Sequence, residues 1–135
     1  MTLGDGSAIR LDGSDLAIRI THHYRVVEAS GPTGQWKVAS AAYWYFLEEF
    51  EGREILSFHW HPNSRSHLTT PHLHLHQGAQ VQQSALARAH VPTGRVALEE
   101  FLRMVITDFE VKPLRPDWDD ALTESQAGFD SSRTW

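Results

Sequence analysis

The stretch DLAIRITHHYRVV, residues 15–27, decides the fold, because apolar and polar side chains alternate along most of its length. Leu16, Ile18 and Ile20 fall on one side of an extended chain, and Arg19 falls on the other. Side chains of a β-strand point alternately to the two faces of its sheet, so this pattern predicts a long, half-buried strand. The fold is therefore expected to contain a sheet with one apolar face.

Three more strands are predicted on the C-terminal side of this stretch. The turn-forming run SGPTG at 30–34 leads into residues 36–50, which are rich in aromatic residues with period-two character. A short glycine turn at 51–53 then leads into an alternating segment at 54–61, which predicts a hairpin. Alternation resumes at 72–76, where we expect a fourth strand.

Helices are expected only near the C-terminus. Between residues 97 and 110, apolar residues recur at steps of three and four, which predicts a long amphipathic helix. A short C-terminal helix is expected at 118–125, and residues 77–90 fit either a helix or a loop with a short strand. Strands joined by short turns and followed by helices predict an α+β fold. We expect an antiparallel sheet of about four to five strands, packed against the long helix and the short C-terminal helix.

Length and composition limit what the chain can be. A chain of 135 residues fits one domain, expected over 1–135 with frayed residues at 1–7 and 128–135. It has no cysteine, which excludes disulfides, thiolate catalysis and cysteine-based zinc sites. No stretch reads as a membrane span or an export signal, so we expect a cytoplasmic protein. A net charge of −5 disfavours broad electrostatic capture of nucleic acid.

Four consecutive aromatic residues occupy positions 43–46. In a strand they must point to both faces of the sheet. We expect Trp44 and Phe46 to pack in the core, which leaves the other side of the strand to stack a base or form a dimer contact.

Histidines are the unusual feature of the composition, with nine in the chain. The sequence PHLHLHQG at 71–78 places His72, His74 and His76 at every second position, so their side chains point to one face of the predicted strand. His59 and His61 have the same spacing on the preceding strand. If the two strands pair in matching register, these imidazoles share one surface.

This surface has three interpretations. The first is a polar sheet face with no special chemistry. The second is a divalent metal site, for zinc or a similar ion, in which neutral imidazoles are the ligands and a glutamate can approach from the hairpin. Its candidate ligands are His59, His61, His72 and His74, and its candidate glutamates are Glu48, Glu49 and Glu54.

The third interpretation is phosphate chemistry, in which one histidine attacks or relays a proton while charged groups steady a phosphoryl group. The candidate catalytic residues are His74, His72 and His59. The candidate ligand-binding residues are His61, His76, Arg65, His67 and Arg95, since arginine suits bidentate phosphate contacts.

The HLHLH run at 72–76 resembles the core motif of the histidine triad nucleotide hydrolases and transferases. The resemblance implies that His74 is the nucleophile on an α-phosphate. The chain departs from that pattern at Gln77 and Gly78, where the family has two apolar residues, and in the polar loop that precedes the strand.

A second resemblance covers roughly a third of the chain. The segments SFHWHPNSRSHLTTPHLHL and AHVPTGRVALEEFLRMVITDFEV are similar to those of small bacterial proteins akin to the TumE-like toxins of toxin–antitoxin pairs. This resemblance implies a small cytoplasmic protein that acts on or binds RNA and pairs with an antitoxin, and it carries over no catalytic residues.

Besides a histidine-based metal-binding protein, two function classes therefore stay open. The first is a homodimeric, toxin-like protein whose histidine-rich sheet face binds or cleaves a phosphate-bearing ligand, RNA or a nucleotide. The second is a noncatalytic module whose aromatic and histidine surfaces form a protein interface.

Overall fold

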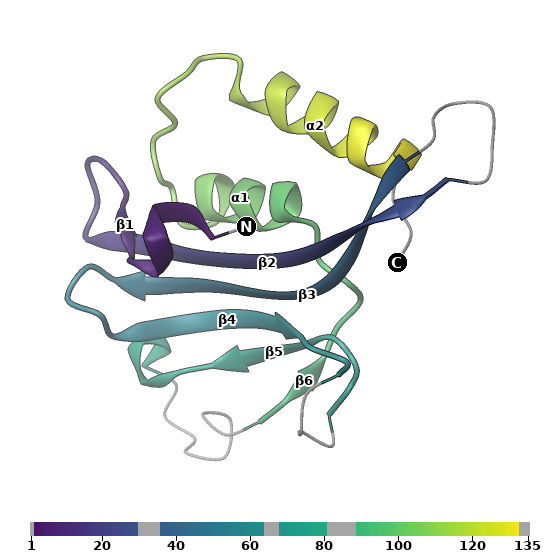
Figure 1. The fold of residues 1–135 in the computed structure, drawn as a ribbon. Helices are drawn as coiled ribbons and strands as arrows, with labels where there is room; N and C mark the ends of the chain where they lie inside the picture. The colour runs from purple at the N-terminus through teal and green to yellow at the C-terminus, as the bar shows by residue number, and fades with distance from the viewer. Residues whose placement is uncertain (1, 30–35, 64–67, 81–88, 133–135) are drawn as a thin grey trace.

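The computed structural model describes residues 2–29, 36–63, 68–80 and 89–132, which form one antiparallel sheet and two helices (Figure 1). Each of the six strands pairs with the next one along the chain. The strands are β1 (Ile9–Arg10), β2 (Leu16–Glu28), β3 (Trp36–Glu49), β4 (Glu54–Trp60), β5 (His72–Leu75) and β6 (Val91–Pro92). The described sheet is therefore a simple meander, consistent with the short turns in the sequence.

The longest element of the sheet is the hairpin of β2 and β3. Leu16 pairs with Glu49 at one end and Glu28 with Trp36 at the other, and a bulge interrupts the register after His23. Ile18 and Ile20 are buried in the core. The predicted buried side is confirmed for the first half of the strand, whereas Tyr24 and Val26, beyond the bulge, are exposed.

Both helices lie on the same side of the sheet, α1 (Leu98–Thr107) nearer to it and α2 (Trp118–Ser132) beyond (Figure 1). Phe101 of α1 is fully buried, with its ring centroid 5.5 Å from that of Tyr45 and 6.3 Å from that of Phe58. Burial of a side chain of this size contributes roughly 1.5–3 kcal/mol to folding. The core therefore lies between the sheet and α1.

Two hydrogen bonds fix the start of α1, and one of them joins it to the sheet. The Glu100 carboxylate accepts the backbone N–H of Ala97 at 2.6 Å, which satisfies a donor that no helix carbonyl can reach. One residue earlier, the backbone N–H of Val96 donates to the Tyr43 hydroxyl of β3 at 3.0 Å. These contacts place α1 over one face of the sheet and leave the opposite face without a helix among the described residues.

The predicted α+β class and antiparallel sheet are confirmed, but the elements differ in number and length. The structure adds the two-residue strands β1 and β6, so the sheet has six strands rather than four or five. The C-terminal helix was predicted to be short, yet α2 has 15 residues and α1 has 10. The last turns of α2 contact the sheet through Phe129, whose ring centroid lies 6.5 Å from that of His22.

The chain before β1 and after β5 contains short 3₁₀ helices. They are η1 (Leu3–Gly6) and η2 (Gln77–Ala79), the second in the segment that the sequence left unassigned. Thr2, at the N-terminal end of the described chain, forms a bridge to Thr21 of β2. No helix in the described ranges has the length and apolar character needed to cross a membrane.

The aromatic run of β3 is oriented opposite to our expectation. Tyr43 and Tyr45 are fully buried in the core, with stacked rings 4.7 Å apart. The rings of Trp44 and Phe46 lie instead near histidines of β4 and the residues that follow it. The expected core packing of Trp44 and Phe46 is therefore wrong, because the register with β2 places the odd-numbered residues of this run against α1.

A candidate metal centre among the histidines

The pairing of β4 with β5 brings the two histidine runs together. His59 lies directly opposite His72, and Ser57 lies opposite His74. Since neighbours two apart on a strand share a face, His59, His72 and His74 project from the same side of the sheet. This side of the sheet is opposite the helices. The observed pairing of β4 with β5 is the matching register that a shared histidine surface requires.

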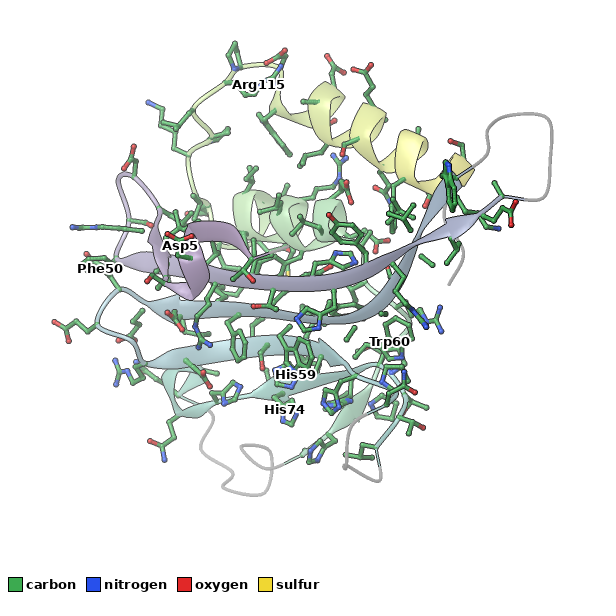
Figure 2. The ribbon with its side chains drawn as sticks, in the orientation of Figure 1. Asp5, Phe50, His59, Trp60, His74 and Arg115 are labelled. Carbon is green, nitrogen blue, oxygen red and sulfur yellow. The ribbon has the colours of Figure 1, made fainter. Side chains whose placement is uncertain are left out.

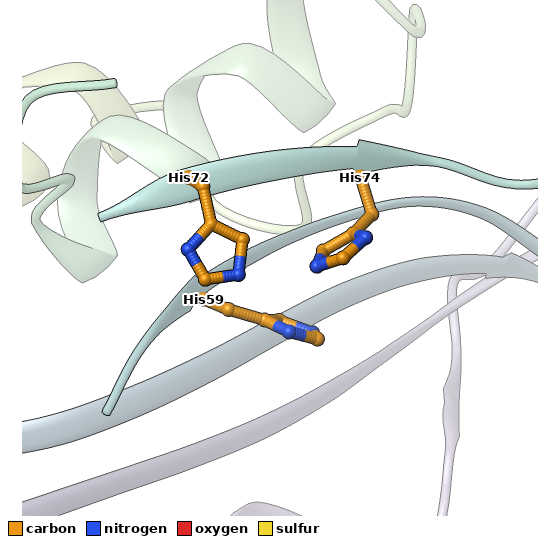
Figure 3. Close-up of side chains that lie close together, drawn as sticks. All are labelled: His59, His72 and His74. Carbon is orange, nitrogen blue, oxygen red and sulfur yellow. The ribbon is translucent and has the colours of Figure 1, made fainter. Parts of the chain in front are cut away.

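The three side chains converge on one point (Figure 3). Each can offer one ring nitrogen, and these three nitrogens lie within 4.8 Å of one another. The ring centroids of His59 and His74 are 4.8 Å apart, and those of His72 and His74 are 4.9 Å apart. Figure 2 shows His59 and His74 beside each other on neighbouring strands. This triplet can hold a metal ion.

The hydrogen bonds leave ring nitrogens of the triplet available. Nδ1 of His72 lies 2.8 Å from the backbone oxygen of Thr70. A carbonyl oxygen only accepts, so Nδ1 carries the proton and Nε2 keeps its lone pair. Nε2 of His59 is buried and has no hydrogen-bond partner within the described part of the chain. Both rings therefore present a nitrogen suited to metal binding, and His72 is oriented as metal-binding histidines usually are.

The surroundings keep two of the rings neutral. Burial, followed by the neighbouring imidazoles of His74 and His72, lowers the pKa of His59 to about 3. Burial, followed by His90 and His72, lowers the pKa of His74 to about 4. At pH 7 both side chains are unprotonated, which is the state in which imidazole binds a metal and in which it does not attract phosphate.

More imidazoles surround the triplet. The ring of His61 lies 5.7 Å from that of His72, the ring of His76 lies 5.8 Å from that of His74, and the ring of His90 lies 4.4 Å from that of His74. We call the triplet and these three residues the histidine cluster. His61 was predicted as a ligand, but it is not among the three residues whose nitrogens lie within 4.8 Å of one another.

His90 is the member of the cluster that sequence reasoning missed. It lies directly before β6, which pairs with β5 and so returns the chain to the histidines. Its ring centroid is 5.2 Å from that of His72, and its side chain is exposed. Sequence reasoning could have found His90 only by recognising the strand Val91–Pro92 that follows it. A strand of two residues is too short to show a pattern.

A chain of polar contacts supports the cluster from one side. Ser57 Oγ and His76 Nε2 share a hydrogen bond of 2.9 Å, and His76 Nδ1 lies 3.3 Å from a Glu54 carboxylate oxygen. Arg19 then donates to Glu54 at 2.8 Å and to Glu48 at 3.0 Å. Glu48 and Glu54 are thus occupied by Arg19, and Glu49 by Arg53, so none of the three candidate glutamates joins the triplet.

The order Ser57, His76, Glu54 is that of a serine hydrolase triad, but burial excludes that chemistry here. Ser57 is fully buried, so its oxygen has no access to a substrate. The hydrogen bonds instead hold the His76 ring, which stacks on His74 at an interplanar angle of 25°. The network therefore positions a member of the triplet.

The predicted arginine and loop residues have different placements. The guanidinium of Arg95 lies 3.9 Å from the centre of the Trp60 ring, which belongs to the core cluster on the helix side. Arg65 and His67 lie outside the described residues. The structure thus brings together His59, His61, His72, His74 and His76 from the predicted set.

Comparison of the chain with protein-family models, curated proteins and solved structures found no significant match. The chemistry of the histidine cluster is therefore the observation that bears most directly on function.

Proposed function

We propose that the protein binds a divalent transition metal, with zinc as the best-suited ion, through His59, His72 and His74. The observation that carries this proposal is the convergence of three ligand nitrogens within 4.8 Å on one side of the sheet. Three histidine ligands with a fourth position open to water or substrate are typical of catalytic zinc sites. Imidazole also suits nickel and copper, and the absence of cysteine leaves histidine and carboxylate as the ligand types.

Metal binding requires a small closure of the rings. In a tetrahedral site, zinc–nitrogen bonds of about 2.0–2.1 Å place two ligand nitrogens about 3.3–3.4 Å apart. The nitrogens of the triplet are up to 4.8 Å apart, so a modest rotation of the side chains brings them into range. A metal bond at His59 Nε2 also satisfies a buried polar atom that lacks a partner among the described residues.

A phosphate-bearing ligand remains part of the proposal, as a ligand of the metal centre. Neutral His59 and His74 do not supply the positive charge that binds a phosphoryl group. A bound cation supplies that charge and polarises a phosphoryl oxygen. The exposed His90 lies beside the triplet, where it can donate to such a ligand. Pairing with an antitoxin, homodimer formation and a noncatalytic interface stay predictions.

Metal content tests the proposal directly. Protein purified without a histidine tag, stripped with chelator and titrated with zinc is expected to bind one ion per chain. His74→Ala is expected to weaken binding at least about 100-fold, because loss of even an outer-shell partner typically costs 10–100-fold. His23→Ala is the matched control, since this exposed histidine lies outside the triplet.

Elemental analysis and calorimetry give the stoichiometry and the affinity. Circular dichroism of His74→Ala establishes that the sheet is intact, and the half-buried position of this residue makes it a safer substitution than the buried His72. Wild-type protein that binds no zinc at millimolar concentration rules the proposal out. Equal affinity of wild type and His74→Ala does so as well.

A further inference from the structure

A small cavity adjoins the histidine cluster on the same side of the sheet. Its volume is about 270 Å³. It is lined by His23, Ala41, Ala42, Trp44, His61 and Asn63, which come from β2, β3 and the chain that follows β4. Sites for drug-sized ligands have volumes of about 300–1,000 Å³, so this cavity fits one ring system rather than a larger molecule.

Two residues connect the cavity with the triplet. Trp44 pairs directly with His59 across β3 and β4. The ring of His61 lies 5.6 Å from that of Trp44 and 5.7 Å from that of His72. A ligand with one end in the cavity therefore has its other end beside the candidate metal centre.

The cavity wall is suited to a flat ring. Trp44 and His61 both line the cavity, and their rings are nearly parallel, with an interplanar angle of 8° and an offset centroid separation of 5.6 Å. The ring of His23 meets Trp44 edge-on at 5.3 Å. The Asn63 amide can both donate and accept, as recognition of the edge of a heterocyclic base requires.

We propose that this cavity is the base subsite of a nucleotide ligand, whose phosphate reaches the metal held by His59, His72 and His74. The inference rests on the proposed metal centre for the phosphate end and on Trp44 and His61 for the base end. The ligand is a single nucleotide unit, free or within an RNA strand. The net charge of −5 agrees with local recognition of one unit rather than electrostatic capture of a long strand.

Binding measurements on the zinc-loaded protein test the base subsite. AMP is expected to bind at least about tenfold more tightly than ribose 5-phosphate, because base–aromatic stacking adds affinity that the sugar phosphate lacks. Trp44→Ala is expected to remove this difference while the zinc stoichiometry stays at one. Trp44→Phe keeps an aromatic ring and is expected to retain most of the preference. A short RNA oligonucleotide, compared with AMP, identifies whether the unit is bound free or within a strand.

The two proposals fail differently. Equal affinity for AMP and ribose 5-phosphate in zinc-loaded, folded protein overturns the base subsite and leaves the metal centre intact. Unchanged AMP affinity in Trp44→Ala also overturns it. If zinc does not bind, adenosine binding to the metal-free protein decides the base subsite alone. Binding that depends on Trp44 supports it, and absence of binding contradicts it.

Discussion

At the scale of single residues, the triplet combines one well-oriented imidazole with one whose Nε2 has no hydrogen-bond partner among the described residues. His72 donates through Nδ1 to the Thr70 carbonyl, which leaves Nε2 for a ligand. His59 Nε2 is buried without a partner in the described ranges, an arrangement that costs free energy unless something binds there. Under the proposed function, a bound metal ion supplies the missing partner of this nitrogen.

Substitution of Ser57 tests whether this residue supports the histidine cluster without itself binding the metal. Ser57→Ala removes a fully buried hydroxyl and leaves His76 Nε2 without its hydrogen bond. We expect a loss of about 0.5–1.5 kcal/mol in the free energy of unfolding, the usual net contribution of one hydrogen bond, because the His76 side chain is only half-buried. Urea denaturation measures the loss. The zinc stoichiometry is expected to remain one per chain, and its disappearance would contradict a purely positioning role.

His22 makes stability depend on pH. Burial lowers the pKa of this histidine, which contacts Ser40 and Tyr45 on the core side. The unfolded chain takes up a proton near pH 6.5, and the folded chain resists doing so. The contribution of neutral His22 to the free energy of unfolding is therefore complete above about pH 6.5, and it decreases as the pH drops below that value.

The variant His22→Gln is expected to lose less stability between pH 7.5 and pH 5 than wild type does. Both proteins are measured in urea after chelation, so that no metal contributes. His59 and His74 also have a lowered pKa, but they are present in both proteins and cancel in the comparison. An identical pH dependence in the two proteins would show that His22 is not responsible.

The placement of some of these residues could be predicted from the sequence, and that of others could not. The spacing within each run was enough to predict that His72 and His74 share a face, but the register that places His59 opposite His72 was a condition that only the structure supplies. Trp44 was assigned to the wrong face, because four aromatic residues in a row have no polar member to mark the exposed side. His90 was missed because its position depends on where the chain returns after a segment with no clear pattern.

At the scale of elements, the register of β4 against β5 determines the site. A slip of one residue would turn either His59 or the β5 histidines to the helix side and separate the triplet. Leu56 and Leu73, on the core side of the same strands, pack with Ile55 and Phe58 against the core cluster and oppose such a slip. The histidine positions are thus fixed by the apolar residues between them.

The packing of α1 gives a prediction for the core. Phe101→Ala leaves a cavity against Tyr45 and Phe58, and we expect it to lower the free energy of unfolding by about 3–5 kcal/mol. The control is Leu114→Ala, because Leu114 is 88% exposed and its removal is expected to change stability by no more than about 0.5 kcal/mol. Chemical denaturation compares the two, and a similar small loss in both would contradict the assigned core.

The elements that sequence analysis missed are short or weakly patterned. The strands β1 and β6 have two residues each, too few to show a period. The α2 helix continues to Ser132 although its sequence has few apolar residues, since contacts such as that of Phe129 with His22 hold its last turns. Long elements with a regular period, such as β2 and α1, were recognisable from the sequence.

At the scale of the whole molecule, the two faces of the sheet have different roles. One face packs against the helices and forms the core, while the other carries the histidine cluster and the Trp44 cavity. Because the triplet joins β4 and β5, a metal bound there crosslinks neighbouring strands. Metal binding and folding are therefore expected to be coupled.

This coupling predicts stabilisation by zinc. At a free zinc concentration 100 times the dissociation constant, the native state gains about 2.7 kcal/mol if the unfolded chain does not bind the ion. Thermal unfolding of wild type is expected to shift upward with zinc, and that of His74→Ala is expected to shift little. His23→Ala is expected to behave as wild type. The same shift in all three proteins would indicate binding elsewhere on the chain.

X-ray absorption spectroscopy of the zinc-loaded protein tests the central claim most directly, because it counts the ligands of the bound ion. We expect zinc with three imidazole nitrogens at about 2.0–2.1 Å in wild type and the loss of one imidazole in His74→Ala. Zinc surrounded only by oxygen ligands, or a spectrum unchanged by His74→Ala, would contradict it.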